Sequence, residues 1–378
     1  MSIARNDIAG RIAWTTALRE PQSALAWSLA DWERVIRLAR RLRLLARLAE
    51  SLDAAGLLDA VPQAPRRHLL AEQQVSRFRT AAMLWALQRI RSVLGDCTFP
   101  CVLLKGAAYL GQELQIAAGR LPSDIDILVP KAHVAEVQRM LAGDGWSEVA
   151  LDAHDQRYYR EWSHEAPPMR HPLHPLELDL HHDILPPLAR THVDIERLLA
   201  RVQPSRWHGW QVLQPVDQVL HSATHLFQDS QAVDRLRDLI DLDGLMRQFA
   251  LAPSFYDDLV ARARELGLSL PLAMAFHFCA EWLRTPIPIQ ALRELQTDGA
   301  TASQRRWLMP TLAALLTPTD PDEAPRRSQD VAAVLFLARH HAGRMPLRLL
   351  LPHLLRKLRR RKETTAPPDG ADVRTDGG

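Results

Sequence analysis

The sequence predicts an α+β fold in which a small mixed sheet with helices lies between two helical regions. Apolar residues recur at helical spacing before residue 95 and again after residue 187, whereas short apolar or alternating runs typical of strands lie between them. The 378 residues, of which 47% are hydrophobic, are enough for two or three packed domains. We expect an N-terminal helical region, an α+β core, a C-terminal helical domain, and a basic helix with a disordered tail, over 1–95, 96–188, 189–345 and 346–378.

Composition excludes several classes of protein. The formal charge of +3 is too weak to make polyanion binding a general expectation. The three cysteines cannot build a disulfide framework, and none of their spacings is the two-residue gap of a zinc knuckle or a redox pair. The first 20 residues lack the pattern of a secretory signal, and no stretch approaches the roughly 20 apolar residues that cross a bilayer. We therefore expect a cytoplasmic protein that is soluble or at most attached to a surface.

The first predicted elements are helices followed by one buried strand. Apolar residues at helical spacing predict helices from Trp27 to about Gly95, with a second run over 69–94. The apolar run 99–104 then lacks helical polarity and leads into Lys105 and Gly106. We interpret this run as a buried strand that ends at that pair.

The next segments continue the core. Residues 107–118 predict a helix and 119–123 a turn, and the sequence Asp-Ile-Asp-Ile-Leu-Val predicts a strand over 124–129. The strict alternation at 176–181 predicts a half-buried strand. Between them we expect a helix, two weaker strands and a Pro- and His-rich link, at 131–141, 146–151, 157–162 and 167–175.

The chain is predicted to return to helix after Pro187. Spaced apolar residues favour helices over five stretches, namely 216–227, 233–249, 254–266, 271–283 and 331–339. The polar, Pro- and Gly-rich end from residue 364 predicts disorder.

Paired carboxylates mark the predicted core strands. Side chains two apart on a strand point the same way, so Asp124 and Asp126 project together. The alternation at 176–181 likewise places Glu177, Asp179 and His181 on one face. Adjacent carboxylates repel unless solvent screens them or a hard divalent cation such as Mg²⁺ lies between their oxygens. These residues are therefore candidate metal ligands.

The spacing Asp-x-Asp alone proves little, because it recurs elsewhere. Asp241 and Asp243 lie in a predicted helix, and Asp320 and Asp322 lie in a Pro-rich loop. We interpret both of these pairs as solvated or turn residues.

Three segments together carry a resemblance to a known family. LLKGAAYL at 103–110, GRLPSDIDILVP at 119–130 and LELDLHHDI at 176–184 resemble the signature of the bacterial uncharacterised nucleotidyltransferase family, within the DNA polymerase β-like nucleotidyltransferase superfamily. This resemblance implies a polymerase β-like core. The sequence departs from the wider superfamily in having Lys105 and Gly106 where Gly-Ser is more usual, and in a long gap before the aspartates.

The resemblance implies Mg²⁺-dependent transfer of a nucleoside monophosphate from a nucleoside triphosphate (NTP), expected to be ATP, to an acceptor hydroxyl on a small molecule or a protein. Mn²⁺ could replace Mg²⁺. By the resemblance, the catalytic residues and metal ligands are Asp124, Asp126 and Asp179, with Asp179 also able to take the proton. The same resemblance implies a set of partners for the nucleotide phosphates, namely Lys105, Gly106, Arg120 and Ser123. His181 joins this set because it lies on the Asp179 side of its strand.

Each candidate also has a structural interpretation. The aspartates could form a solvated strand face, with Glu177 as a rival for the role of Asp179. Lys105 could extend from a strand end to water, and Arg120 could brace its turn. His181 could bond a phosphate or orient a carboxylate.

The histidines have interpretations of their own. Zinc binding by His171, His174, His181 and His182 is disfavoured, since the last two point to opposite strand faces. His221 and His225, four apart on a predicted helix, could pack locally or line the nucleotide cleft.

A basic segment at 344–362 leaves a further alternative. It holds Leu and basic residues without acidic ones, so it predicts either a helix docked on the protein or a contact with anionic membrane or nucleic acid. We keep two alternatives to the enzyme: a catalytically inactive or regulatory nucleotide-binding protein of the same fold, antitoxin-like or an assembly module, and a basic-tail adaptor.

Overall fold

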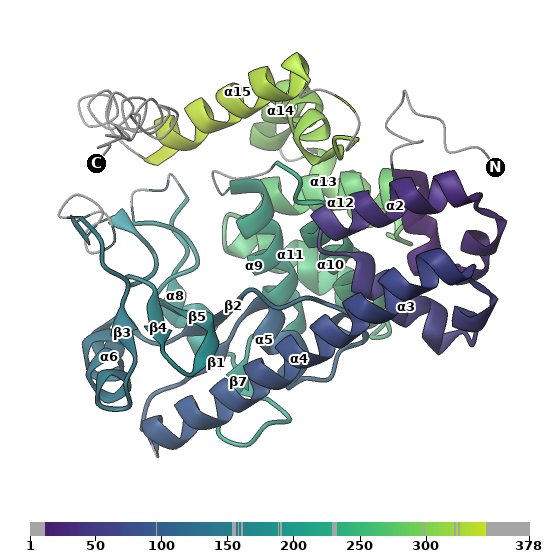
Figure 1. The fold of residues 1–378 in the computed structure, drawn as a ribbon. Coiled ribbons are helices and arrows are strands. Elements are labelled where there is room, and N and C mark those ends of the chain that lie inside the picture. Colours follow the sequence, from purple (N-terminus) through teal and green to yellow (C-terminus); the bar gives the residue numbers. More distant parts are fainter. Residues whose placement is uncertain are drawn as a thin grey trace, which may run out of the picture.

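A central mixed sheet packs against an N-terminal and a C-terminal group of helices, and these two groups also contact each other (Figure 1). This computed structural model describes residues 12–95, 97–152, 156–157, 159, 162–187, 189, 191–228, 233–297, 299–320, 323 and 326–344. The mixed α+β class predicted from the sequence is confirmed.

Seven strands form the sheet within the described residues, in the order β3-β4-β5-β2-β1-β7-β6. The strands are β1 Val102–Leu103, β2 Asp124–Leu128, β3 Ser147–Glu148, β4 Met169–His171, β5 His174–His181, β6 Gln203–Pro204 and β7 Gln211–Val212. β2 runs parallel to β5 and antiparallel to β1, whereas β1 runs parallel to β7. The strands that carry the predicted acidic residues are therefore neighbours at the middle of the sheet.

The N-terminal helices pack against the sheet through one long helix. They comprise α2 Leu29–Arg41, α3 Leu45–Ala54 and α4 Gln63–Leu94, preceded by short 3₁₀ turns η1 Ala13–Leu18 and η2 Pro21–Ala26. α2 begins with a capping box, because Ser28 accepts from the Asp31 backbone and Asp31 accepts from that of Ser28. α4 contacts α2 and α3 at one part and α6 and β5 at another (Figure 1).

Short helices connect the strands. α5 Lys105–Gly111 and the 3₁₀ turn η4 Gln115–Ala117 lie between β1 and β2, and η5 Lys131–His133 with α6 Val134–Gly143 follows β2. α8 Ile195–Leu199 precedes the β6–β7 hairpin.

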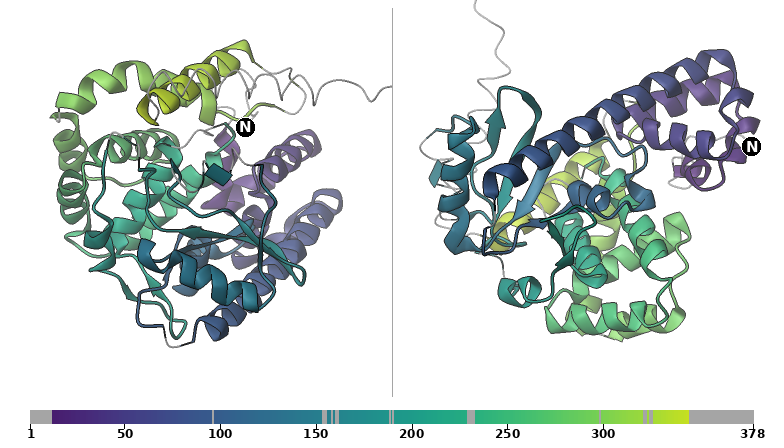
Figure 2. Two further views of the ribbon diagram at one scale, coloured as in Figure 1. Left: turned by 90° about the vertical axis from the view of Figure 1, so that its left-hand side faces the viewer. Right: turned by 90° about the horizontal axis from the view of Figure 1, so that it is seen from below.

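The C-terminal helices pack around α12, most of whose residues are apolar. α12 contacts α9, α10, α11, α13 and α14. Their bounds are α9 Pro215–Gln228, α10 Leu236–Phe249, α11 Phe255–Glu265, α12 Ser269–Leu283, α13 Ile289–Thr297, α14 Gly299–Leu316 and α15 Arg327–Arg344. Figure 2 shows these helices beside the sheet, on the side away from α4. None of the helices in the described part of the chain combines the length and apolar character needed to cross a bilayer.

Several sequence predictions are wrong in detail. The predicted link at 167–175 instead holds a hairpin, in which His171 of β4 pairs with His174 of β5 across Pro172 and Leu173. The strand predicted at 157–162 is helical at the residues that the structure describes. The all-helical prediction after Pro187 missed β6 and β7, because strands of two residues show no alternation. The basic helix and tail predicted over 346–378 lie outside the described residues.

In the two additional Asp-x-Asp pairs, the three aspartates that the structure describes are not solvated, contrary to the prediction from the sequence, and Asp322 lies outside the described residues. Asp241 and Asp243 on α10 and Asp320 are all buried. Asp241 pairs with two arginines, Asp243 binds Arg247 and other donors, and Asp320 pairs with Arg34. Helical spacing predicts which residues share a face but not which charges oppose that face, so the burial could not be foreseen.

Candidate active site

Three carboxylates lie on one face of two neighbouring strands. In the parallel pairing of β2 and β5, Asp126 lies directly opposite Asp179, and Asp124 lies opposite Glu177. Paired residues in adjacent strands are about 5 Å apart and point to the same face. Asp124, Asp126 and Asp179 therefore share one acidic face of the sheet, as the alternation of each strand predicted.

Glu177 is the rival that the sequence left open, and it has a different partner. The guanidinium of Arg170, on β4, donates to Glu177 Oε1, with Nε at 2.6 Å. The Glu177 side chain is 39% exposed, whereas Asp126 is almost fully buried. This contact draws Glu177 toward β4 and the solvent.

Asp126 is the most constrained of the carboxylates. Lys105 Nζ donates to its Oδ1 at 2.8 Å, and His181 Nε2 lies 2.9 Å from the same oxygen. Burial alone would raise the pKa of Asp126, but Lys105 and His181 outweigh it and hold that pKa well below its usual range. Burial would lower the pKa of Lys105, but Asp126, Asp124 and Glu165 keep that pKa raised. Asp126 is therefore a carboxylate anion held by a cation.

Lys105 also has an unusual backbone conformation. Its φ of 44° lies in the left-handed region, which costs a residue with a Cβ roughly 1–2 kcal/mol. Leu104 N donates to Asp126 O at 3.1 Å, so β2 fixes the backbone just before this residue. The strained turn directs the ammonium group to Asp126, in line with the tendency of such strain to occur at functional sites.

Asp179 has the opposite electrostatic environment. Burial raises its pKa to about 7, and the neighbouring carboxylates Asp126, Glu165 and Asp124 contribute to the rise. Glu165 was not identified from the sequence, because it follows no strand pattern. It forms an isolated β-bridge with His181, and its Oε2 lies 3.7 Å from His181 Nε2. The acidic face thus carries more negative charge than its protein cations balance.

A cavity of about 380 Å³ adjoins this acidic face. Of the predicted site residues, Lys105, Arg120, Ser123 and Asp124 line it. Its other walls come from the end of α2, from α5, from α9 and from the N-terminal half of α10 with the residues before it. The cavity therefore lies where the N-terminal helices, the sheet and the C-terminal helices meet.

Arginines from distant parts of the chain gather at this cavity. The pKa of Arg43 is lowered, first by burial and then by the positive charges of Arg237, Arg79 and Arg235, while Asp124 opposes the shift. Arg43 also has a left-handed φ of 57°, at the end of α2. Guanidinium groups placed so close to one another favour a polyanionic ligand. No sequence pattern indicated these residues, since they lie far apart along the chain.

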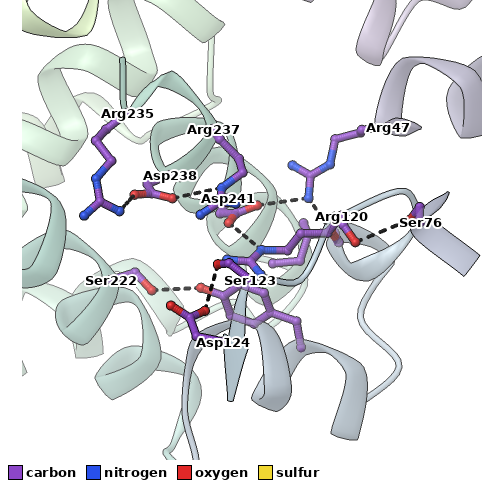
Figure 3. A network of polar contacts seen from close by, with 12 residues as sticks. Arg47, Ser76, Arg120, Ser123, Asp124, Ser222, Arg235, Arg237, Asp238 and Asp241 are labelled. Atoms are coloured by element: carbon purple, nitrogen blue, oxygen red, sulfur yellow. Dashed lines mark hydrogen bonds and ion pairs between the residues drawn. The ribbon is translucent and has the colours of Figure 1, made fainter. Parts of the chain in front are cut away.

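Arg120 is held in a buried ion cluster rather than projecting freely (Figure 3). Its Nε donates to Asp241 Oδ2 at 2.9 Å, and Arg47 Nη2 donates to Oδ1 of the same carboxylate at 2.9 Å. The guanidinium lies 5.5 Å from the ring centroid of Tyr109, and it occupies the space that a side chain at Gly106 would need. In this structure Gly106 therefore accommodates Arg120. Ser123 donates to Asp124 Oδ1 at 2.9 Å, at the cavity wall.

The histidines separate into distinct groups. His171 and His174 pack with Trp146, and Trp85 also contacts His174. His181 instead lies with His164 and Glu165, in a set whose ligand atoms are all within 4.8 Å of one another. The structure thus does not bring together the four histidines considered for zinc.

Two further histidines come from α9. His225 lines the cavity, and His221 is buried nearby. Burial and the charge of Lys105 lower the pKa of His221 to about 3 and that of His225 well below its usual value. Both rings are therefore neutral at pH 7. The position of His225 agrees with the expectation that it lines the cleft from the helical domain.

A comparison with protein families matches residues 28–284 to the family described as "Uncharacterised nucleotidyltransferase". A search of curated proteins and a search of solved structures found no match. The family match covers more than half of the chain, and it includes the acidic strands, the cavity and the helices on both sides. The chain therefore belongs to this family of nucleotidyltransferases.

Proposed function

We propose that the protein transfers a nucleoside monophosphate from an NTP, with ATP as the first candidate, to an acceptor hydroxyl of a small molecule or a protein in a Mg²⁺-dependent reaction. The observation that carries this proposal is the register of β2 and β5, which aligns Asp126 with Asp179 beside a cavity that Asp124 lines. Arg43, Arg235 and Arg237 supply positive charge on the wall of the same cavity.

The donor set fits a hard divalent cation. Carboxylate oxygens are the protein ligands that Mg²⁺ prefers, and Mn²⁺ accepts the same ligands. The pKa of Asp179 is raised first by burial and then by neighbouring carboxylates, whose negative charge a bound cation would neutralise. Both protein contacts of Asp126 fall on Oδ1, so Oδ2 takes neither. Asp124, Asp126 and Asp179 would hold the metal, which when bound would polarise the phosphates and favour loss of the acceptor's proton.

Side chains of the protein itself bind the triphosphate and accept the proton. The guanidinium groups of Arg43 and Arg237 bind triphosphate oxygens, and Ser123 offers a hydroxyl at the same wall. The acceptor oxygen attacks the α-phosphorus and forms a P–O bond, while the bond to the β-phosphate oxygen breaks and pyrophosphate leaves. Asp179 takes the acceptor's proton on its carboxylate.

The ion pair between Lys105 and Asp126 favours a second candidate, a regulatory nucleotide-binding protein without transfer activity. A lysine bound to Asp126 at 2.8 Å supplies part of the positive charge that a metal would bring. In this alternative NTP would still bind at the arginines, but no bond at the α-phosphorus would break.

Ligand-induced stabilisation tests the binding site. ATP with Mg²⁺ should raise the unfolding temperature of the wild-type protein, by an amount equivalent to about 2.7 kcal/mol at a ligand concentration 100-fold above the dissociation constant. ATP without Mg²⁺ should have a much smaller effect. Asp124→Asn should abolish the Mg²⁺-dependent part, whereas the matched control Glu177→Gln should retain it. Equal stabilisation of wild type and Asp124→Asn would overturn the site.

A further inference from the structure

Two of the cysteines are in contact. Both precede β1 in the chain, whereas Lys105 follows that strand. Cys97 Sγ and Cys101 Sγ lie 3.4 Å apart. A disulfide needs about 2.05 Å between the sulfurs, so they must approach by only about 1.4 Å. Cys279, by contrast, is fully buried, and its sulfur contacts the Leu239 carbonyl at 3.8 Å.

The backbone around the pair allows this approach. Residues 97–100 form no helix or strand, between the end of α4 and the start of β1. Cys101 is fixed, because its carbonyl accepts from Gln211 N at 3.0 Å. The short movement can therefore be made by Cys97 without displacing the sheet.

The two sulfurs have different surroundings. Both terminal guanidinium nitrogens of Arg91 contact Cys97 Sγ at 3.8 Å, so a cation lies against this sulfur. Arg91 is held by the Gly209 carbonyl at 3.0 Å and by the Trp210 ring. Cys97 is partly exposed, whereas Cys101 is 2% exposed. Burial and the neighbouring Cys97 raise the pKa of Cys101 to about 12, so Cys101 stays a thiol.

We infer that Cys97 and Cys101 form a site of reversible oxidation, at which a peroxide converts the two thiols into an intramolecular disulfide. The Cys97 thiolate attacks a peroxide oxygen, an S–O bond forms, the O–O bond breaks and hydroxide leaves. The Cys101 sulfur then attacks the Cys97 sulfur, so that an S–S bond forms and the S–O bond breaks. Hydroxide leaves and takes the Cys101 proton as water. Overall, two thiols and one hydrogen peroxide give one disulfide and two waters.

Mass spectrometry of the full chain tests this inference, which does not depend on the proposed transfer activity. Cys97 and Cys101 lie in one tryptic peptide, Ser92–Lys105. After a brief treatment of the reduced protein with hydrogen peroxide, that peptide should lose the mass of two hydrogens and resist alkylation, and dithiothreitol should reverse both changes. Cys279 should remain fully alkylated when the treated protein is denatured.

Variants separate the two roles. In Cys101→Ser, peroxide should leave a sulfenic acid on Cys97 that dimedone traps. In Cys97→Ser, the peptide should remain unmodified, and Cys279→Ser should behave like the wild type. Arg91→Gln should slow the oxidation several-fold. Equal oxidation of Cys279 and the pair, a disulfide between two chains on a non-reducing gel, or full alkylation of the peptide after peroxide would each overturn the inference.

Discussion

Replacing Asp241 by asparagine should destabilise the fold by about 3–5 kcal/mol, because it removes the buried anion that Arg47 and Arg120 share. The side chains of Asp241, Arg120 and Arg47 are 4%, 9% and 11% exposed. Asparagine has almost the same volume as aspartate, so no cavity contributes to the loss. The cost arises from leaving two guanidinium groups buried without their counter-charge.

The cluster joins three parts of the chain, which makes this loss informative. Arg47 comes from α3, Arg120 precedes β2, and Asp241 lies on α10 (Figure 3). Urea unfolding followed by circular dichroism measures the loss, with Asp59→Asn as the matched control. Asp59 pairs with Arg66 at the same 2.9 Å, but its side chain is fully exposed, so that variant should match the wild type. If Asp241→Asn lost no more stability than Asp59→Asn, the cluster would not hold these parts together.

Three further outcomes follow from the same geometry. Arg120 and Arg47 outweigh burial and hold the pKa of Asp241 below its usual value. The difference in unfolding free energy between wild type and Asp241→Asn should therefore be full above pH 3.8 and disappear as the pH falls below it, in unfolding measured as a function of pH. A difference that persists when Asp241 is protonated would refute the charge argument. Arg43→Gln should weaken ATP binding roughly 10- to 100-fold in calorimetric titration, the equivalent of one lost charge-assisted hydrogen bond, without affecting stability; unchanged affinity would remove Arg43 from the site. Asp179→Asn should abolish monophosphate transfer in a product assay while Glu177→Gln retains it, and the reverse order would exchange their roles.

The local geometry of the acidic strands could be predicted from the sequence. Alternation alone places Asp124 with Asp126 and places Asp179 with His181, since side chains two apart share a face. The register that aligns Asp126 with Asp179 was beyond such reasoning. It depends on a parallel pairing between segments that α6, β3 and β4 separate along the chain, which local patterns do not encode.

The arginines of the cavity illustrate the same limit. Arg43 lies at the end of an N-terminal helix and Arg237 on a C-terminal one, and each by itself resembles an ordinary surface arginine. Their proximity becomes apparent only when the three parts of the chain pack together. Asp241 was misinterpreted for this reason too, because its two partners come from elsewhere in the chain.

The central claim is tested most directly by following the phosphate that moves. The protein should be incubated with Mg²⁺, a cell extract and ATP labelled at either the α- or the γ-phosphate, and the wild type should be compared with Asp126→Asn. The account predicts that the wild type attaches the α-phosphate label to an acceptor and releases the γ-phosphate label in pyrophosphate. It also predicts that Asp126→Asn neither labels an acceptor nor releases pyrophosphate. Transfer of γ-label to the acceptor, or equal transfer by Asp126→Asn, would contradict it.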